Sequence, residues 1–408
     1  MHPASTSQPH PTTRDVLARP HVPALLTGTL VGRLSTAMAP LALLLAVRAA
    51  GGPVMLGAAL AALYALASAV GQPLLGRVVD RTRLGIVSAL AASVAFTAFS
   101  VLAATDLAAR PLTAAALAVL AGAATPPLEA GLRALWPRLV PDPAEQRVAF
   151  TLDSVSQEIV FVAGPLAATA LCELLSPAAA LWACGVVGGI GAGIVATRPP
   201  ADWPPAERRE VHWSGPLRSR GLLVLLAAML CLGVNLGAFN VLAIALADRT
   251  GAGWLTGLLP AALSVGSLLG GIAYTRSPWP LPPQHQLLAA AGGYAACFAP
   301  LLFTTVPLAA VAFAVAPGLY LSPLLAIGFQ LADRLAPAGT ATEAAAWLVA
   351  VVGVGQALGT AAAGRLAEHG TASVATLAVF AAVLAAAVLL PRIDLLNPRP
   401  TTSQETSA

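Results

Sequence analysis

Two charged side chains fall inside long apolar stretches, where an uncompensated charge is costly. Arg33 lies about halfway along the apolar stretch 22–47, and Glu158 lies ten residues after Val148, where a later apolar stretch begins. Charges in such surroundings need a partner and often mark a functional site. We expect Arg33 to pair with Glu158, so that protonation of the glutamate would free the arginine to move. The alternative is a permanent ion pair that only fixes helix packing.

A second charged group is predicted nearer one end of the neighbouring segments. Glu129 and Arg133 are four residues apart, so on a helix they share a face and can pair directly. Asp153 is expected at a similar depth on the following segment, with Gln157 on the same helix face and Glu158 on a different one. A salt-bridge network at the segment ends is the favoured interpretation, and a gate that breaks when the protein opens is the alternative.

The composition of the whole chain excludes a water-soluble protein. Of its 408 residues, 57% are hydrophobic and 10% are charged, and the mean hydropathy is +0.79. Soluble proteins carry about 25% charged residues, so the composition predicts an all-α integral membrane protein embedded in the lipid bilayer. The net charge of +4 arises without a single lysine, which indicates a GC-rich coding bias. The arginines form no clustered basic face of the kind that binds nucleic acid.

Twelve apolar segments are each long enough to cross the ~30 Å of hydrocarbon as a helix. They are 22–47, 54–75, 84–104, 111–136, 148–171, 178–196, 221–247, 254–274, 287–306, 308–332, 342–366 and 371–390. The long polar connection between the sixth and seventh divides them into two halves. The predicted organisation is a disordered tail (1–20), a six-helix bundle (21–197), a linker (198–219), a second six-helix bundle (220–392) and a disordered tail (393–408).

The arginines also predict the orientation, because arginines in short loops favour the cytoplasmic side. With both termini in the cytoplasm, 17 arginines fall in inner tails, loops and helix ends, 4 fall on the outer side, and Arg33 lies within a helix. We therefore expect both termini to be cytoplasmic.

The connection between the second and third segments is short and charged, and runs from Gly76 to Arg83. Gly76 permits a close backbone approach, and the carboxylate of Asp80 can meet the positive end of a helix. Arg81 and its neighbours mark the cytoplasmic side. A generic positively charged hairpin is the alternative interpretation.

The two halves resemble each other in sequence. Pro127–Pro141 laid on Pro323–Pro337 without gaps gives seven identities in fifteen positions, including Arg138 with Arg334. The stretch Gly270–Arg276 is similar to the Gly76 connection, but it lacks the aspartate. Together these matches predict two repeats related by an axis along the membrane normal.

With these features the sequence resembles the major facilitator superfamily of secondary transporters. The signature of that family between its second and third helices reads G-x-x-x-D-R-x-G-R-R. Gly76, Asp80 and Arg81 match it, while Arg83 stands in place of the second glycine. The resemblance covers 23–390 and implies a fold of two pseudo-symmetric six-helix bundles. It also implies alternating access, with the three matching residues as a cytoplasmic latch between the halves.

Three further features bear on mechanism. Gly164-Pro165 predicts a bend in the fifth segment, and it partly matches a longer helix 5 signature in exporters of the superfamily, whose final glycines are missing here. Asn235 and Asn240 are candidate substrate contacts, although hydrogen bonding between helices is their favoured use. Glu343 follows Thr340 at the spacing of a capping box and is expected to be a structural cap.

These observations predict a monomeric transporter of a bacterial cytoplasmic membrane that exports a small, fairly apolar organic solute in exchange for protons. Arg33, Glu158 and Asp153 would couple the two movements. The histidines and cysteines lack metal-ligand spacing and no phosphate-binding loop is present, so we expect no enzyme activity, no cofactor and no metal. The alternatives are proton-coupled uptake of a metabolite, with Arg33 as an anion anchor, and a non-transporting membrane sensor or scaffold on the same fold.

Overall fold

The computed structural model describes residues 12–202, 215–276, 281–302, 306–367 and 369–396. Within these ranges the chain is helical and contains no strand. The first half holds α2 (Val22–Ala49), α3 (Val54–Arg81), α4 (Leu84–Ala104), α5 (Pro111–Ala123), α6 (Leu128–Leu139), α7 (Pro143–Leu174) and α8 (Pro177–Ala196). The second half holds α9 (Arg220–Thr250), α10 (Leu255–Arg276), α11 (Pro283–Phe298), α12 (Pro307–Leu335), α13 (Ala341–Ala367) and α14 (Thr371–Leu389).

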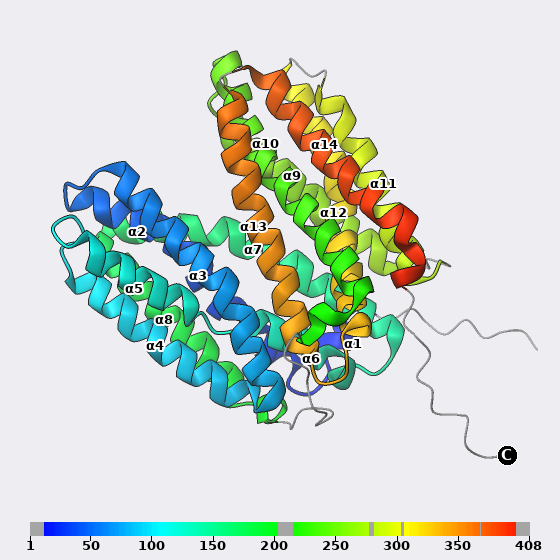
Figure 1. Ribbon diagram of the computed structural model, residues 1–408, viewed down its shortest axis with the longest axis horizontal. Helices are drawn as coiled ribbons and strands as arrows, with labels where there is room; N and C mark the ends of the chain where they lie inside the picture. The colour runs from blue at the N-terminus through cyan, green and yellow to red at the C-terminus, as the bar shows by residue number, and fades with distance from the viewer. Residues whose placement is uncertain (1–11, 203–214, 277–280, 303–305, 368, 397–408) are drawn as a thin grey trace, which may run out of the picture.

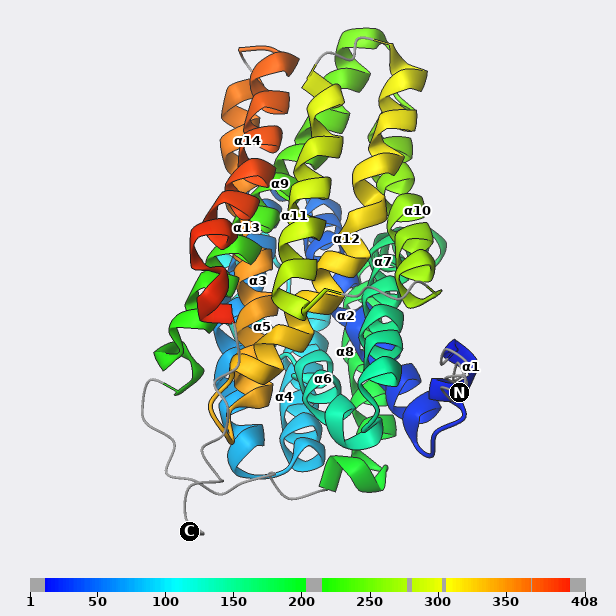
Figure 2. The same ribbon diagram turned by 90° about the vertical axis from the view of Figure 1, so that its right-hand side faces the viewer.

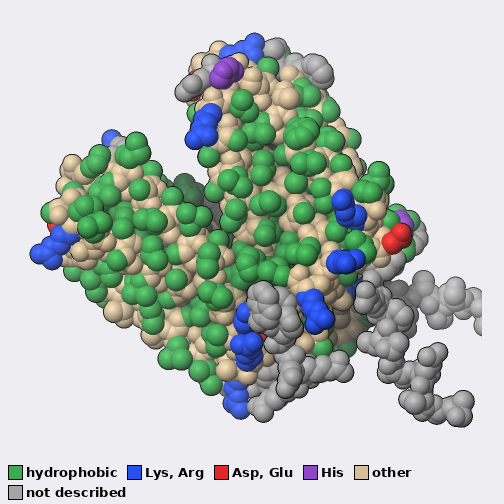
Figure 3. Space-filling view, in the orientation of Figure 1, with side chains coloured by type: hydrophobic (Ala, Val, Ile, Leu, Met, Phe, Trp, Pro, Cys, Tyr) green, Lys and Arg blue, Asp and Glu red, His purple; other side chains and the backbone are tan. Residues whose placement is uncertain are grey.

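The helices have the length and surface of membrane-spanning segments. In the described part of the chain, 10 helical spans are long and apolar enough to cross a membrane. Large apolar side chains are exposed on their outer faces, with Leu90 and Leu166 each 65% accessible, and apolar side chains cover both lobes in Figure 3. Exposure of such an apolar surface to water is unfavourable, whereas exposure to lipid is not. The protein is therefore a multi-pass membrane protein.

The two bundles meet at one end and separate at the other (Figure 1). The shared end carries the α3–α4 and α6–α7 connections and the short turn η2 (Gly215–Arg218), and we call it the linker end. There α3 and α6 pack against α13, and α7 packs against α10 and α12. Towards the opposite end, the splayed end, a hollow lies between the two lobes (Figure 3).

Small residues bring helices of the first bundle unusually close together. A Cβ atom added to Gly191 of α8 would lie 2.2 Å from the backbone nitrogen of Gly32 on α2. In a membrane, where the hydrophobic effect does not drive helices together, such close backbone packing is a main source of helix association. It fixes α2, and with it Arg33, within the first bundle.

The fourth predicted segment, 111–136, is not one helix. It is divided into α5 and α6 at residues 124–127, because Pro126 and Pro127 carry no N–H. The carbonyls of Gly122 and Ala123 consequently lose the donors that an unbroken helix would supply, and Gly122 accepts instead from the N–H of Thr125 at 3.0 Å. The break places the start of α6 inside the bundle.

Two other boundaries differ from the prediction. The helix expected to end at residue 75 continues to Arg81, so the Gly76–Arg81 stretch forms the last turns of α3 rather than a loop. In the tail predicted to be disordered, α1 (Thr13–Leu17) is closed by hydrogen bonds from Thr12 to Asp15. It lies beside α2 and α7 (Figure 2). Residues 1–11, 203–214 and 397–408, which hold the rest of the predicted tails and much of the linker, lie outside the described ranges.

Candidate functional site

Four charged side chains of the first half form one buried network. Arg133 on α6 donates to Glu129 one turn earlier, to Asp153 on α7, and to the side-chain oxygen of Gln157 at 3.3 Å. Arg33 on α2 reaches the same two carboxylates. Its Nη1 lies 3.0 Å from Asp153 Oδ1, and its Nε lies 3.2 Å from Glu129 Oε2. Each carboxylate therefore bridges both arginines, and the four formal charges cancel.

The network is almost completely removed from solvent. The side chains of Arg133 and Asp153 are each 1% exposed, while those of Arg33 and Glu129 are 8% and 10% exposed. Because Glu129 lies in the first turn of α6, the broken segment also directs a positive helix end towards its carboxylate. Removing one member would leave an uncompensated buried charge, which is strongly unfavourable.

The sequence spacing predicted two separate groups of charged residues, and the structure joins them in one network. The Arg33 guanidinium is engaged by Glu129 and Asp153, because α2 packs along α7 and lies against α6. The side chain of Glu158 lies outside the described residues, so its pairing with Arg33 stays a prediction.

The face of the Arg133 guanidinium is covered by the second half. Its Cζ atom lies 3.3 Å from the centroid of the Phe329 ring on α12, and Phe329 is buried. A second contact of the same kind occurs between α7 and α10, where the Cζ atom of Arg147 lies 5.8 Å from the centroid of the Tyr274 ring. In both contacts the first half supplies the cation and the second half supplies the aromatic face.

Polar contacts also join α3 to α13 at the linker end. The carboxylate of Asp80 accepts hydrogen bonds from the backbone N–H groups of Thr342, at 3.0 Å, and Glu343, at 2.9 Å. Arg77 donates to the Glu343 carboxylate at 3.0 Å and 2.6 Å. A Cβ atom on Gly76 would lie 3.1 Å from the Cα atom of Glu343, so this position favours glycine.

These contacts correct one predicted role. Glu343 does not cap its own helix, because its carboxylate bonds to Arg77. Asp80, from the other half of the molecule, accepts from the free N–H groups at the start of α13 instead. Of the two arginines beside Asp80, Arg77 crosses to the second half, while Arg81 is exposed. Arg77 was not predicted to have this role, because the stretch was expected to be a loop rather than a helix with one inward face.

The remaining predicted site residues lie elsewhere. Gly164 on α7 packs against Ala37 of α2, where an added Cβ would lie 2.4 Å from the Ala37 Cβ, and α7 is helical throughout Gly164-Pro165. Asn235 is buried and ties three helices together, donating to the carbonyl of Ala378 at 2.8 Å and accepting from the Tyr294 hydroxyl at 2.5 Å. Asn240 is exposed.

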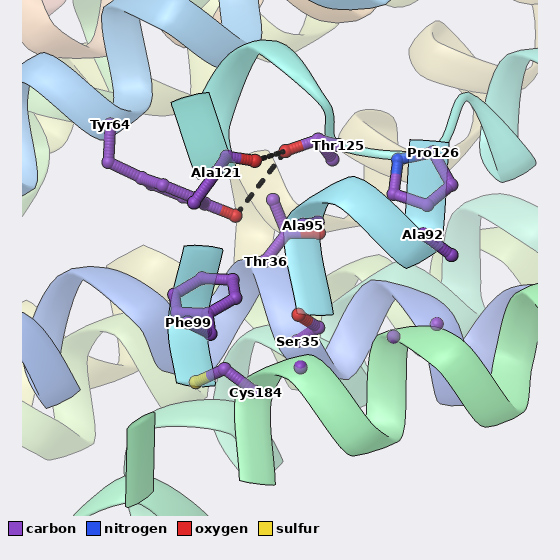
Figure 4. A pocket seen from close by; sticks show the side chains of 13 residues that line it. Ser35, Thr36, Tyr64, Ala92, Ala95, Phe99, Ala121, Thr125, Pro126 and Cys184 are labelled. Atoms are coloured by element: carbon purple, nitrogen blue, oxygen red, sulfur yellow. Dashed lines mark hydrogen bonds between the residues drawn. The ribbon is translucent and has the colours of Figure 1, made fainter. Parts of the chain in front are cut away.

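A small pocket lies beside the break between α5 and α6, inside the first bundle (Figure 4). The hydroxyls of Tyr64 and Thr125 lie 3.5 Å apart within it, and the Thr125 hydroxyl donates to the carbonyl of Ala121 at 3.4 Å. The Thr125 hydroxyl thus supplies a donor to the Ala121 carbonyl, while the Thr125 N–H bonds to the Gly122 carbonyl instead. The residues that line the pocket all belong to the first bundle.

The fold and this site together define a helical membrane carrier built from two similar halves. The family model of the Major Facilitator Superfamily matches residues 25–342. The chain belongs to the Major Facilitator Superfamily, and it is a membrane transporter rather than an enzyme. No curated protein matches the sequence.

Solved structures agree with this assignment at the level of the fold. A bacterial homologue of the iron transporter ferroportin, in an outward-facing state, has a TM-score of 0.70 and 16% identity, covering 90% of this chain and 98% of its own. The transporter FucP in the outward conformation has a TM-score of 0.64 and 15% identity, covering 91% and 98%. The human organic anion transporter MFSD10 has a TM-score of 0.61 and 15% identity, covering 95% and 100%.

Proposed function

We propose that this protein is a proton-coupled exporter of a small, fairly apolar organic solute in a bacterial cytoplasmic membrane, working by alternating access. One observation carries the proposal: two buried carboxylates, Glu129 and Asp153, are each shared by the same two arginines. Such a network has a balanced charge only while both acids are ionised.

Protonation would change the network in a defined way. If Asp153 takes up a proton, Arg33 and Arg133 share the single charge of Glu129, and the buried group acquires a net positive charge. Because burial strengthens electrostatic interactions, the repulsion between the two arginines then favours their moving apart. Proton uptake and conformational change are therefore linked through the same four side chains. Glu158, on the same helix as Asp153, is a further candidate proton carrier.

The contacts at the linker end supply the conformational part of the mechanism. If the arginine-rich linker end faces the cytoplasm, the arrangement described here is closed to the cytoplasm and open towards the outside. Gly76 and Asp80 would act as the latch that holds this state, with Arg77 in the crossing role that the resemblance suggested for Arg81. Protons entering from the splayed end would trigger release of the latch, and the solute would be taken up from the cytoplasm.

The second half supports an apolar solute. Its aspartate, glutamate, arginine and histidine residues in the described helices lie at or close to helix ends, as Asp248, Arg249, Asp333 and Glu343 illustrate. A sugar would need many hydrogen-bonding groups along the path. The direction of coupling can be tested with everted membrane vesicles and an imposed pH gradient of either sign. Accumulation of a panel compound only when the lumen is the acidic side, abolished by a protonophore, is expected for export in exchange for protons. Accumulation only when the lumen is the alkaline side would indicate symport with protons and would overturn export.

One observation favours a second candidate, proton-coupled uptake of an organic anion. In the described part of the chain, no group accepts a hydrogen bond from Nη2 of Arg33, so the N–H groups of this nitrogen could bind a substrate carboxylate. The fold similarity to an organic anion transporter is compatible with this function. Competition between anionic and neutral analogues distinguishes the two, because only an Arg33 anion site discriminates by charge. Flux of either kind would exclude a non-transporting sensor.

A further inference from the structure

The two residues that stack between the halves occupy equivalent positions in the internal repeat. When Pro127–Pro141 is laid on Pro323–Pro337, Arg133 falls on Phe329. In the structure these equivalents meet face to face, with 3.3 Å between the Arg133 Cζ atom and the Phe329 ring centroid. Residues related by an internal pseudo-axis can touch only where that axis passes between the halves. Arg133 and Phe329 therefore lie at the interface between the bundles, where a relative rotation of the bundles changes the contact between them.

In the Arg133–Phe329 contact, the two halves of the molecule bind different parts of the guanidinium. The nitrogen atoms of Arg133 are used by Glu129, Asp153 and Gln157, all within the first half. Only the flat face of the guanidinium remains for the second half, and the Phe329 ring covers it. Among the described residues, Phe329 is the one member of the second half with a hydrogen bond, ion pair or ring contact to the charge network.

We propose that Phe329 is the residue through which the second half senses the protonation state of the network. This inference rests on the proposed proton coupling. With both acids ionised, Asp153 and Glu129 hold the guanidinium in one plane against the ring. When Asp153 is protonated, Nε of Arg133 loses its charged partner and the guanidinium turns towards Glu129. The stack is then broken, and the linker end loses a contact that joins α6 to α12. Phe329 is a positioning residue, since it acts through Arg133.

The requirement is for an aromatic face rather than for bulk. A cation over a desolvated ring is attracted by the negative charge density of its face, whereas leucine fills similar volume without that attraction. In Phe329→Leu the second half should therefore no longer respond to the protonation state of the network, whereas in Phe329→Tyr it should still respond. Other titratable or charged groups near these helices must be separated from this effect. They are Arg33 on α2, Asp80 on α3, Arg138 on α6, Arg147 and Glu158 on α7, Tyr274 on α10, Asp333 and Arg334 on α12, and Glu343 on α13.

Asp333 provides the most direct control. It lies one turn beyond Phe329 on α12 and is largely buried, so it could contribute a pH response of its own at the linker end. Asp333→Asn removes that titration and leaves both Phe329 and the four-residue network intact. The sensing should persist in this variant, whereas Asp153→Asn should abolish it.

The test uses spin labels at two exposed linker-end positions, Arg83→Cys and Ala338→Cys, in a full-length chain without its native cysteines. Double electron–electron resonance in lipid nanodiscs between pH 5 and 9 gives the ratio of open to closed linker ends. We expect the otherwise native chain to open as the pH falls. In Phe329→Leu this ratio at high pH should rise by about tenfold, as expected for loss of a buried cation–π contact, and its pH dependence should flatten. Phe329→Tyr should behave like the native chain.

The outcomes separate this inference from the proposed function. An unchanged pH response in Phe329→Leu, together with a flat response in Asp153→Asn, would overturn the role of Phe329 and leave proton coupling standing. A native chain that does not respond to pH, or an Asp153→Asn variant that responds fully, would overturn the coupling itself. If Phe329→Leu does not fold, Phe329→Met replaces it, because methionine also fills the site without an aromatic face.

Discussion

The carboxylate of Asp80 on α3 lies 2.9 Å from the backbone nitrogen of Glu343, in the first turn of α13. Helix starts carry N–H groups without intrahelical acceptors, and here the acceptor comes from the opposite half of the molecule. The same turn is bound by Arg77 through the Glu343 side chain. One helix start in the second half is thus satisfied only while the linker end is closed, which makes this contact sensitive to conformation.

Asp80→Ala should shift the protein away from the closed linker end. Loss of a side-chain acceptor at a helix start costs about 1 kcal/mol, and this cost falls only on the closed state. The labelled pair described above would report a higher open fraction. Asp106→Ala is a matched control, since Asp106 accepts from the N–H groups of Ala108 and Ala109 in a turn at the splayed end. An equal shift in both variants would show that the Asp80 contact has no special role.

Exchange of the two charges in the Arg77–Glu343 pair should restore the thermal stability that is lost when either charge is reversed alone. The Arg77 side chain is 25% exposed and that of Glu343 only 2%, so Arg77→Glu alone sets two acids against each other in a largely buried place. Thermal stability in detergent should fall in each single variant and recover in Arg77→Glu/Glu343→Arg. A double variant no better than the sum of the single ones would mean that the pair contributes nothing as a pair.

Gly215→Ala should disturb the same pair through the linker. Gly215 has φ +51°, and an added Cβ would lie 2.7 Å from Glu343 Oε2 and 3.0 Å from Arg77 Nη2. Gly251→Ala is the control, because Gly251 has φ +67° and no atom within 4 Å of the added Cβ. Both should lose about 1 kcal/mol of stability from the backbone conformation alone. Only Gly215→Ala should also raise the open fraction at the linker end, and equal behaviour of the two would refute this.

Asn235→Ala should reduce stability without altering solute recognition. The substitution removes the hydrogen bonds of Asn235 to the carbonyl of Ala378 and the hydroxyl of Tyr294, which join helices of the second bundle. The expected loss is about 1–2 kcal/mol, measured by thermal unfolding in detergent. KM for a transported compound should stay the same. A change in KM with unchanged stability would restore Asn235 as a substrate contact, and Asn240→Ala provides the comparison for an exposed asparagine.

Much of the fold could be predicted from sequence, because its physical signals are strong and local. The apolar stretches have the length of a bilayer crossing, and the Pro127–Pro141 and Pro323–Pro337 repeat indicates duplication. The break within 111–136 was not predicted, although the sequence contains two adjacent prolines there, Pro126 and Pro127. Membrane helices often tolerate proline, because local rearrangements supply other donors, as where the Thr125 N–H bonds to the Gly122 carbonyl and the Thr125 hydroxyl to the Ala121 carbonyl.

The site was predictable only in its membership. Arg33, Glu129, Arg133 and Asp153 were identified as rare charges in apolar segments, but their pairing depends on how α2 rotates against α6 and α7. A difference of about 100° per residue along a helix decides whether Arg33 meets Asp153 or another acid, and sequence spacing within one helix does not fix the rotation of its neighbour. Phe329 was not predicted, because a phenylalanine in an apolar helix ordinarily faces lipid or core; its one signal in the sequence is the internal repeat, which aligns it with Arg133.

The most direct test of the central idea, that the buried network couples proton movement to solute movement, compares the native protein with Asp153→Asn in proteoliposomes. Solute-evoked proton movement is recorded across a compound panel, and solute binding is measured in parallel, with Asp106→Asn as the control. The account predicts coupled proton movement in the native protein and in the control, and loss of that movement with retained binding in Asp153→Asn. Full proton-coupled flux in Asp153→Asn would contradict it.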